Sequence, residues 1–170
     1  SLGIRFDMVD SQLRIFRRAL GPIAALAFAF TLLAARPAAA VPLAGTYVIG
    51  AGGDYATMTA AAAALTANGI SGPTSFLIKT GTYSESTVLG SITGASPANR
   101  IRFVAQSGNA ADVVLTFAAT TAGTDPVILL SGAQYVDFDS LTMTSTGGAV
   151  NGSLVWLAGT TKADRFQGCV

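Results

Sequence analysis

The sequence predicts an all-β fold built as a solenoid, and three observations support this prediction. Short runs of β-branched and aromatic residues recur along the chain, each bounded by Gly, Asn, Ser or Pro. Apolar and polar side chains alternate within many of these runs, which is typical of strands with one buried face. Similar segments also recur at intervals of 26 to 28 residues. A period in this range, with strands in each repeat, indicates coils that stack on one another.

Two series of residues carry the repeat. The first consists of strand residues 26 and 27 positions apart, namely Arg102, Ile128 and Val155. In the second, residues 135–142 align with residues 163–170 at an offset of 28, which sets Phe138 against Phe166. A β-sandwich is the alternative, because it also consists of short strands. The register of the two series favours the solenoid.

Residues 1–40 carry the features of an export signal. A basic cluster comes first, namely Arg14, Arg17 and Arg18. The apolar run 19–35 follows it, and the small residues 38–40 end the segment. A signal peptide has its basic, apolar and small-residue regions in this order, so we expect cleavage after Ala40. Met8 is a candidate start, which would leave residues 1–7 upstream of it.

An uncleaved transmembrane anchor is the alternative for this segment. The apolar run is close to the lower limit for a membrane span, about 17 residues, and it is rich in Ala rather than Leu. Gly21 and Pro22 also weaken it as a long helix. The adjacent small residues favour a cleaved signal peptide. Residues 41–170 would then form a secreted or cell-surface domain with no membrane span.

Charge and residue usage in residues 41–170 exclude several classes of function. Five basic residues accompany seven acidic ones there, so the formal net charge is −2 and nucleic-acid binding is disfavoured. The chain has no His, which removes the commonest general base and the commonest zinc ligand. Cys169 is the only cysteine, so stability must come from burial and backbone pairing rather than from an intrachain disulfide.

The exported part begins with a strand, a turn and a helix. Residues 46–49 form a β-branched and aromatic run that ends in a glycine-rich turn. The stretch 58–68 is the one helix predicted, because Ala is the best helix former. Thr57 or Asp54 can cap its first turn, and Gly69 supplies a left-handed stop.

After this helix no further helical period appears, and the remaining elements are predicted to be strands. The predicted strands are 74–79, 82–83, 86–89, 101–105, 113–117, 127–130, 135–138, 141–144, 154–157 and 166–170.

Two segments near the start resemble the opening of a known fold family. The first, 47–65, places a glycine-rich turn, Asp54 and an aromatic residue before the helix. The second, 76–85, contains the pattern Lys79-x-Gly81-x-Tyr83-x-Glu85. Together they resemble the N-terminus of pectin-lyase-like right-handed parallel β-helices, including pectinesterases. The similarity is greater to the opening of large secreted bacterial β-helix-repeat proteins, and it extends from residue 45 to about residue 144.

The resemblance implies both a fold and a place in a longer protein. It implies a right-handed parallel β-helix whose first coil is closed by the helix, which would cover unpaired strand edges. In enzymes of this fold the catalytic residues lie on later coils, so an active groove would lie largely beyond Val170. Because the last strand stops in mid-pattern, we expect the chain to be the N-terminal portion of a longer protein.

Asp137 and Asp139 are the candidate site residues. They flank Phe138, and residues two apart on a strand point to the same side, outward if Phe138 points inward. The resemblance implies that such paired acids serve calcium-dependent lyases and two-aspartate esterases, so both are candidates for catalysis and for calcium binding. A solvated face is the simpler interpretation. Arg165 aligns with Asp137 through the 28-residue offset and would form a cross-coil ion pair.

Three further features are interpreted as structural. The glycine-rich segment 50–53 lacks the Lys-Ser/Thr of a phosphate-binding loop and is expected to be a turn. Trp156 and Tyr135 could stack on sugar rings, but single aromatic residues on strands more often pack in the core. Cys169 aligns with Leu141, an inward position, so a buried and inert thiol is expected.

Two classes of function follow. The first is a secreted or cell-surface β-helix protein whose side binds a polysaccharide or another surface ligand. The second is an enzyme, a polysaccharide lyase or a pectinesterase-like protein, with catalytic coils downstream of residue 170. No cofactor is expected apart from calcium in the second case.

Overall fold

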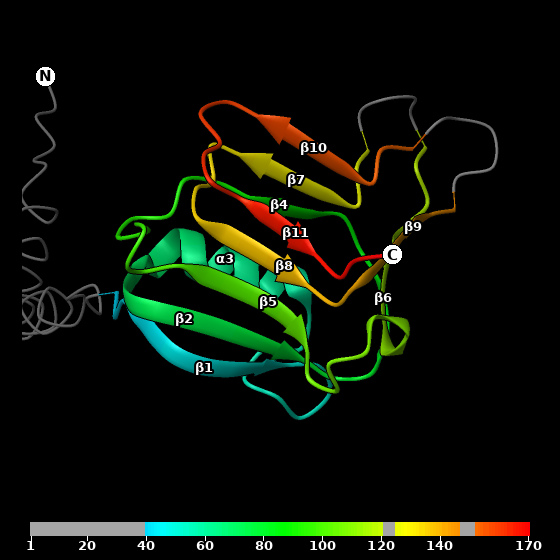
Figure 1. The fold of residues 1–170 in the computed structure, drawn as a ribbon, viewed down its shortest axis with the longest axis horizontal. Coiled ribbons are helices and arrows are strands. Elements are labelled where there is room, and N and C mark those ends of the chain that lie inside the picture. Colours follow the sequence, from blue (N-terminus) through cyan, green and yellow to red (C-terminus); the bar gives the residue numbers. More distant parts are fainter. Residues whose placement is uncertain (1–39, 121–124, 147–151) are drawn as a thin grey trace, which may run out of the picture. The chain divides into compact units, whose positions relative to one another are not determined.

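The computed structural model describes residues 40–120, 125–146 and 152–170 (Figure 1). This part of the chain is mostly β, with parallel sheets and one α-helix, which confirms the predicted all-β class. The predicted signal peptide, residues 1–40, lies outside the described residues except for Ala40. Within the described ranges, no helix has the length and apolar character needed to cross a membrane.

The elements follow the predicted order closely. The strands are β1 (Leu43–Ile49), β2 (Ile70–Ile78), β3 (Gly81–Ser84), β4 (Thr87–Leu89), β5 (Ile101–Ala105), β6 (Val113–Phe117), β7 (Ile128–Ser131), β8 (Val136–Asp139), β9 (Thr142–Ser145), β10 (Val155–Ala158) and β11 (Arg165–Gln167). The helix is α3 (Met58–Asn68), and the short 3-10 helix η1 (Ala110–Asp112) precedes β6. The largest difference at a strand start is in β2, which begins at Ile70 rather than at residue 74.

The strands form three parallel sheets. Sheet A has the order β1-β2-β5-β8-β11, sheet B the order β3-β6-β9, and sheet C the order β4-β7-β10. The chain visits A, B and C in turn, for example through β2, β3 and β4, and then repeats the round through β5, β6 and β7. From β2 onward, a strand therefore meets its parallel neighbour only after a crossover through the other two sheets, whereas β1 and β2 are joined through the helix. Figure 1 shows the strands of sheet A side by side in this order.

A ladder of stacked rings runs through the interior behind sheet A. Phe76, Phe103, Phe138 and Phe166 occupy matching positions on β2, β5, β8 and β11. Their successive ring centroids lie 4.9, 5.3 and 5.0 Å apart, with nearly parallel planes. The first three side chains are fully buried, whereas Phe166 on the last strand is 40% exposed. The predicted alignment of Phe138 with Phe166 is thus confirmed.

The helix α3 is capped at both ends as its sequence predicts, and Glu85, distant in the sequence, adds further hydrogen bonds at its start. The Thr57 side chain accepts a hydrogen bond from the Ala60 amide, and Gly69 follows the helix at a φ of 66°. Glu85, just after β3, accepts hydrogen bonds from the Met58 and Thr59 amides, each at 2.9 Å. These bonds satisfy free amides at the positive end of the helix dipole.

The buried face of α3 closes part of the core. Met58, Ala61, Ala62 and Leu65 are buried in one cluster with the phenylalanine ladder. Alanine at two of these positions lets the helix approach closely, since it adds little bulk. The helix contacts β4 and β1, so it lies against the first round of strands.

The first repeat series predicted from the sequence is wrong at its first step. Val155 does pair with Ile128, on β10 and β7 of sheet C. Arg102, however, lies on β5 of sheet A and pairs with Ser75 and Asp137. Its spacing of 26 residues from Ile128 therefore joins two different sheets. Spacing alone cannot distinguish the three sheets, because the distance between successive strands varies with loop length.

Candidate functional site

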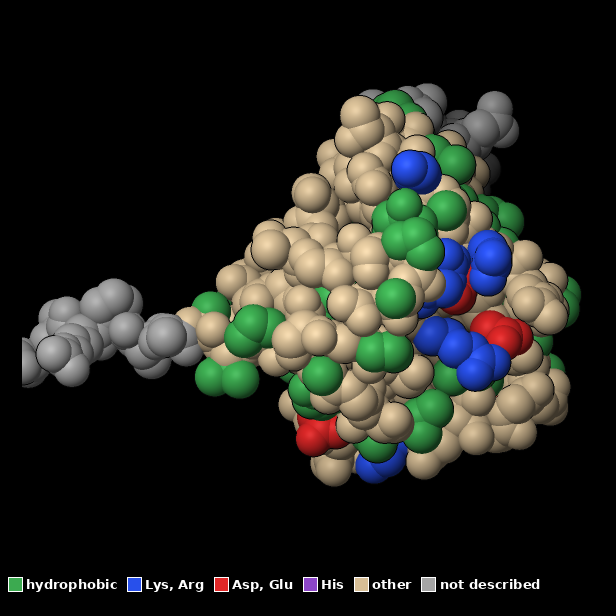
Figure 2. Space-filling model, turned by 60° about the vertical axis from the view of Figure 1, so that its left-hand side comes forward, with side chains coloured by type: hydrophobic (Ala, Val, Ile, Leu, Met, Phe, Trp, Pro, Cys, Tyr) green, Lys and Arg blue, Asp and Glu red, His purple; other side chains and the backbone are tan. Residues whose placement is uncertain are grey.

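The predicted pair Asp137 and Asp139 lies on the outer face of sheet A. Phe138 between them is fully buried, so both carboxylates point outward as predicted. They line a small surface hollow of about 230 Å³, which we call the charged cleft. Its residues come from β5, β8 and β11: Arg102, Asp137, Phe138, Asp139, Arg165 and Gln167. Figure 2 shows basic side chains gathered beside acidic ones on one face of the molecule.

Asp137 forms a two-point ion pair with Arg100, the residue immediately before β5. The Arg100 Nε donates to Oδ2 at 2.6 Å, and its Nη2 donates to Oδ1. The same guanidinium also donates to the Ala163 carbonyl at 2.8 Å, which ties together three successive rounds of the chain. The hydrogen bond to Asp137 raises the pKa of Arg100 above its usual value. Two parallel bonds of this kind fix the carboxylate geometrically.

Asp139 pairs with a second arginine, Arg102 on β5. Its Oδ2 accepts a hydrogen bond from Arg102 Nη2, and its Oδ1 accepts one from the Ser140 hydroxyl at 2.9 Å. The bond from Arg102 is the main cause that lowers the pKa of Asp139, and the Ser140 bond adds to it. Arg102 is the residue in register with Asp137, so it reaches diagonally to Asp139.

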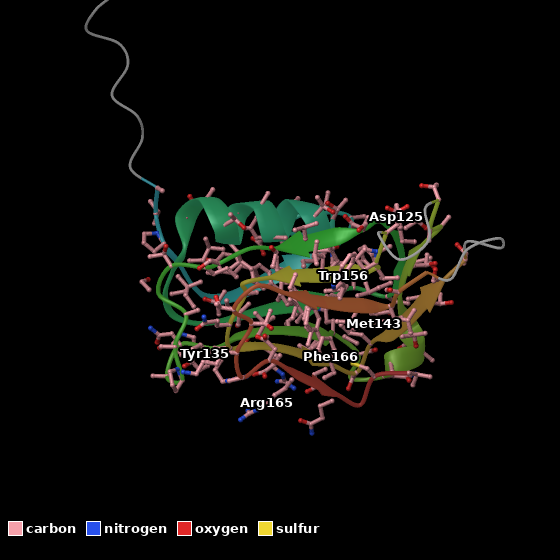
Figure 3. All side chains as sticks on the ribbon, turned by 90° about the horizontal axis from the view of Figure 1, so that it is seen from above. Asp125, Tyr135, Met143, Trp156, Arg165 and Phe166 are labelled. Carbon is pink, nitrogen blue, oxygen red and sulfur yellow. The ribbon has the colours of Figure 1, made fainter. Side chains whose placement is uncertain are left out.

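Among the described residues that line the cleft, Arg165 is the cation without an ion-pair partner. It lies in register with Asp137, as predicted from the 28-residue offset. The predicted ion pair between the two is wrong, because Arg100 already holds both oxygens of Asp137. Within the described ranges Arg165 has no carboxylate within 4.0 Å, and its side chain is exposed. Figure 3 shows it projecting away from the body of the molecule.

The sequence patterns did not predict that Arg100 and Arg102 bind the two aspartates. Each is separated by 37 positions from the aspartate it binds, outside the 26 to 28 residue period. The extra length lies in the connections between β5 and β8. The signal available in the sequence was the alternation of Arg100 and Arg102 around one inward residue, which mirrors that of Asp137 and Asp139.

The calcium role proposed for the two aspartates stays a prediction. Both carboxylates are engaged by guanidinium groups, so a cation would have to displace an arginine to coordinate either one. In the described part of the chain, no three His, Cys, Asp or Glu side chains converge as a metal site would require. The cleft in its present arrangement is better suited to polar or anionic groups, which Arg165 and Gln167 can contact.

The two aromatic residues expected in the core lie elsewhere. Tyr135 is half-buried at the turn before β8, with a φ of 59°. The Arg100 guanidinium and the Lys162 ammonium lie 5.8 and 6.0 Å from its ring centroid. Cation–π attraction, rather than core packing, holds this ring. Trp156 points outward from β10 and is 41% exposed. Val155 and Leu157 are in register with the buried Ile128 and Leu130, so they take the inward side and Trp156 takes the outward side.

The remaining predicted features have structural roles. The glycine-rich segment is a turn, closed by the bond from the Gly53 amide to the Gly50 carbonyl, and Lys79 Nζ donates to the Ala51 carbonyl at 2.7 Å. The Tyr83 hydroxyl donates to the Lys79 carbonyl at 2.9 Å. Cys169 is half-buried rather than buried, because it lies on the last round.

Comparison of the chain with family models, curated proteins and solved structures finds no match.

Proposed function

We propose that residues 41–170 are the first coils of a right-handed parallel β-helix in an exported protein. The three parallel sheets visited in rotation support this proposal, as does the aromatic ladder. The helix α3 serves as the cap of the first coil, and the Lys79-x-Gly81-x-Tyr83-x-Glu85 pattern positions it through Glu85. In this proposal the protein belongs with the secreted pectin-lyase-like β-helices.

Export is tested by the mature N-terminus. The signal predicted in residues 1–40 would be removed near Val41. After expression of the full chain in a bacterium, the protein should appear outside the cytoplasm with a new N-terminus between residues 37 and 44. Recovery of uncleaved protein from the cytoplasm would contradict export.

The side of this β-helix binds polysaccharide through the charged cleft. One observation carries the proposal: Arg165 faces solvent in register with Asp137, while the Asp137 charge is already neutralised by Arg100. A guanidinium group in this position binds a carboxylate well, because its planar donors match the two oxygens. Gln167, on the same face of β11, can bind sugar hydroxyl groups beside it. The ligand class that fits is a polysaccharide with carboxylate groups.

A binding panel tests this function. The protein is run through native gels that contain polygalacturonate, or an uncharged polymer at the same concentration. We expect polygalacturonate to retard migration, and the retardation to weaken as salt rises from 20 to 300 mM, because the contact is a screened surface charge pair. Migration that is the same in the presence and absence of polygalacturonate at low salt would contradict acidic-polysaccharide binding.

An enzyme of the lyase or esterase class is the second candidate. The observation in its favour is the cluster of outward aspartates flanked by arginines on successive strands of sheet A. In this case the catalytic coils follow residue 170, and the present chain should neither cleave nor de-esterify pectin, with or without calcium. Turnover that disappears in Asp137→Ala or Asp139→Ala would instead move the active site into this chain.

A further inference from the structure

The outer face of sheet C carries large apolar side chains at positions where a solvated strand face is usually polar. Val88 on β4, Leu129 on β7 and Trp156 on β10 are in register and form one row across the sheet. Val88 is 51% exposed and Trp156 is 41% exposed, whereas Leu89 and Leu130 on the inner face are fully buried. Given the spacing of neighbouring strands, the row is about 10 Å long.

The outer face of sheet A provides the contrast. Its row in the same orientation consists of polar and charged residues, namely Ser75, Arg102, Asp137 and Arg165. The neighbouring row on that face is apolar at Val48, Leu77 and Val104, but Val104 is buried and the other two are half-buried. The row on sheet C differs because Val88 and Trp156 are exposed. Contiguous exposed apolar side chains on a soluble domain mark an interaction site.

A shallow groove beside α3 extends this row. It has a volume of about 520 Å³, and it is lined by Thr59, Ala62, Ala63, Thr66, Ala67, Ser86, Val88 and Gly90. Val88 belongs to both the groove and the row, so the two form one continuous surface, which we call the apolar face. Its side chains are apolar or carry a single hydroxyl, and none of the residues named in it bears a charge.

We propose that the apolar face binds an uncharged polysaccharide, as a second site distinct from the charged cleft. The C–H face of a pyranose ring is apolar and flat, so it packs against Trp156 and the adjoining aliphatic side chains. A polymer that extends from Trp156 across Val88 reaches the groove with its neighbouring sugar units, whose hydroxyl groups can bond to Thr59 and can donate to the Thr66 and Ser86 hydroxyls. An acidic polymer or an anionic membrane would gain nothing from this face, because it offers no cation.

The two sites lie on different sides of the molecule. Figure 3 places Trp156 toward the side of α3 and Arg165 on the opposite side. Binding at the apolar face can therefore be measured independently of binding at the charged cleft, and failure of one leaves the other intact.

The single tryptophan of the chain supplies the readout. Because Trp156 is the only Trp, fluorescence excited at a wavelength that tyrosine does not absorb reports on the apolar face alone. Titration of the purified protein with hydroxyethylcellulose should shift the emission to shorter wavelength in a saturable way. Val88→Ser should weaken this binding about tenfold, which corresponds to the loss of one apolar contact with the sugar. Arg165→Gln should leave it unchanged.

A second variant and a second measurement complete the test. Trp156→Ala, checked for folding by far-ultraviolet circular dichroism, should no longer be retarded in gels containing hydroxyethylcellulose. Unchanged emission at saturating hydroxyethylcellulose would overturn the proposal. An emission shift that depends on protein concentration without polymer, together with a dimer in sedimentation velocity, would also overturn it, because the face would then bind a second copy of the chain.

Discussion

Arg100 binds the carboxylate of Asp137 at two points, although Arg165 is the residue in register with Asp137 on the next strand. Arg100 and Asp137 are both largely shielded, with about a fifth of each side chain exposed, so their pairing is less screened than a surface contact. Five charged groups therefore lie together on the outer face of sheet A. The charges of Arg100 and Asp137 cancel, as do those of Arg102 and Asp139. Arg165 carries the remaining positive charge and faces outward.

The ion pair of Asp139 predicts a loss of stability in acid. The pKa of Asp139 is lowered in the folded state, so the folded protein releases this proton more readily than the unfolded chain, whose Asp pKa is about 3.9. This contribution is present above the unfolded pKa and is lost as pH falls through the folded pKa. Asp139→Asn should therefore lower Tm at pH 7. The Tm difference from the parent should shrink below about pH 4, and a difference that stays constant with pH would contradict the pairing.

Asp164 should have the opposite effect on the pH dependence of stability, because its pKa is raised. Its Oδ1 accepts a hydrogen bond from the Val136 amide at 2.9 Å, but burial raises the pKa of its carboxyl group. The charged form is thus disfavoured in the fold, and stability decreases as pH rises through the interval above about 3.9. Asp164→Asn keeps an acceptor for Val136 and removes the charge. Thermal unfolding should show a higher Tm than the parent at pH 7, and a Tm at or below that of the parent would show that the charge is favourable.

The hydrogen bonds that Glu85 accepts at the start of α3 should stabilise the protein. Replacement by Ala removes acceptors from the Met58 and Thr59 amides at the start of α3, which should cost about 1–2 kcal/mol of unfolding free energy. Glu85→Gln retains one acceptor and should cost less. Ser84→Ala, at an exposed neighbouring position, serves as the matched control in urea denaturation. Equal effects of the Glu85 and Ser84 variants would rule out the capping role.

The aromatic ladder predicts unequal costs for the same substitution. Phe103→Ala removes a fully buried ring that is stacked between two others. It should lower the free energy of unfolding by about 3–5 kcal/mol. Phe166→Ala removes a ring that is 40% exposed and stacked on one side, so its cost should be well below that of Phe103→Ala. Chemical denaturation of both variants measures the difference. A similar loss for the two would mean that the ladder does not follow the observed strand order.

Local patterns in the sequence were sufficient for most of the elements. Thr57 and Gly69 bound α3 as expected, because caps depend on residues within one turn of the helix end. The offset of 28 residues placed Phe138 beside Phe166 correctly, since both lie on sheet A with similar loops between them. The offset between Arg102 and Ile128 failed, because it crossed from one sheet to another.

The candidate site depended on contacts that local patterns do not contain. The outward direction of Asp137 and Asp139 followed from strand alternation, and it is confirmed. Their partners Arg100 and Arg102 did not follow, because the connection between the strands departs from the repeat. The exposure of Trp156 also required the structure, since strand periodicity leaves open which of two apolar neighbours points inward.

In the proposed function, Arg165 makes the charged cleft a binding site for an acidic polysaccharide. Isothermal titration with oligogalacturonate at low salt measures it directly, comparing the parent with Arg165→Gln and with Lys162→Gln. Lys162 is exposed, carries the same charge and lies outside the cleft lining, so it controls for net charge. We expect Arg165→Gln to raise Kd about threefold to fivefold, in line with loss of one exposed ion pair, while Lys162→Gln changes it less than about twofold. Equal Kd values for Arg165→Gln and the parent would contradict it.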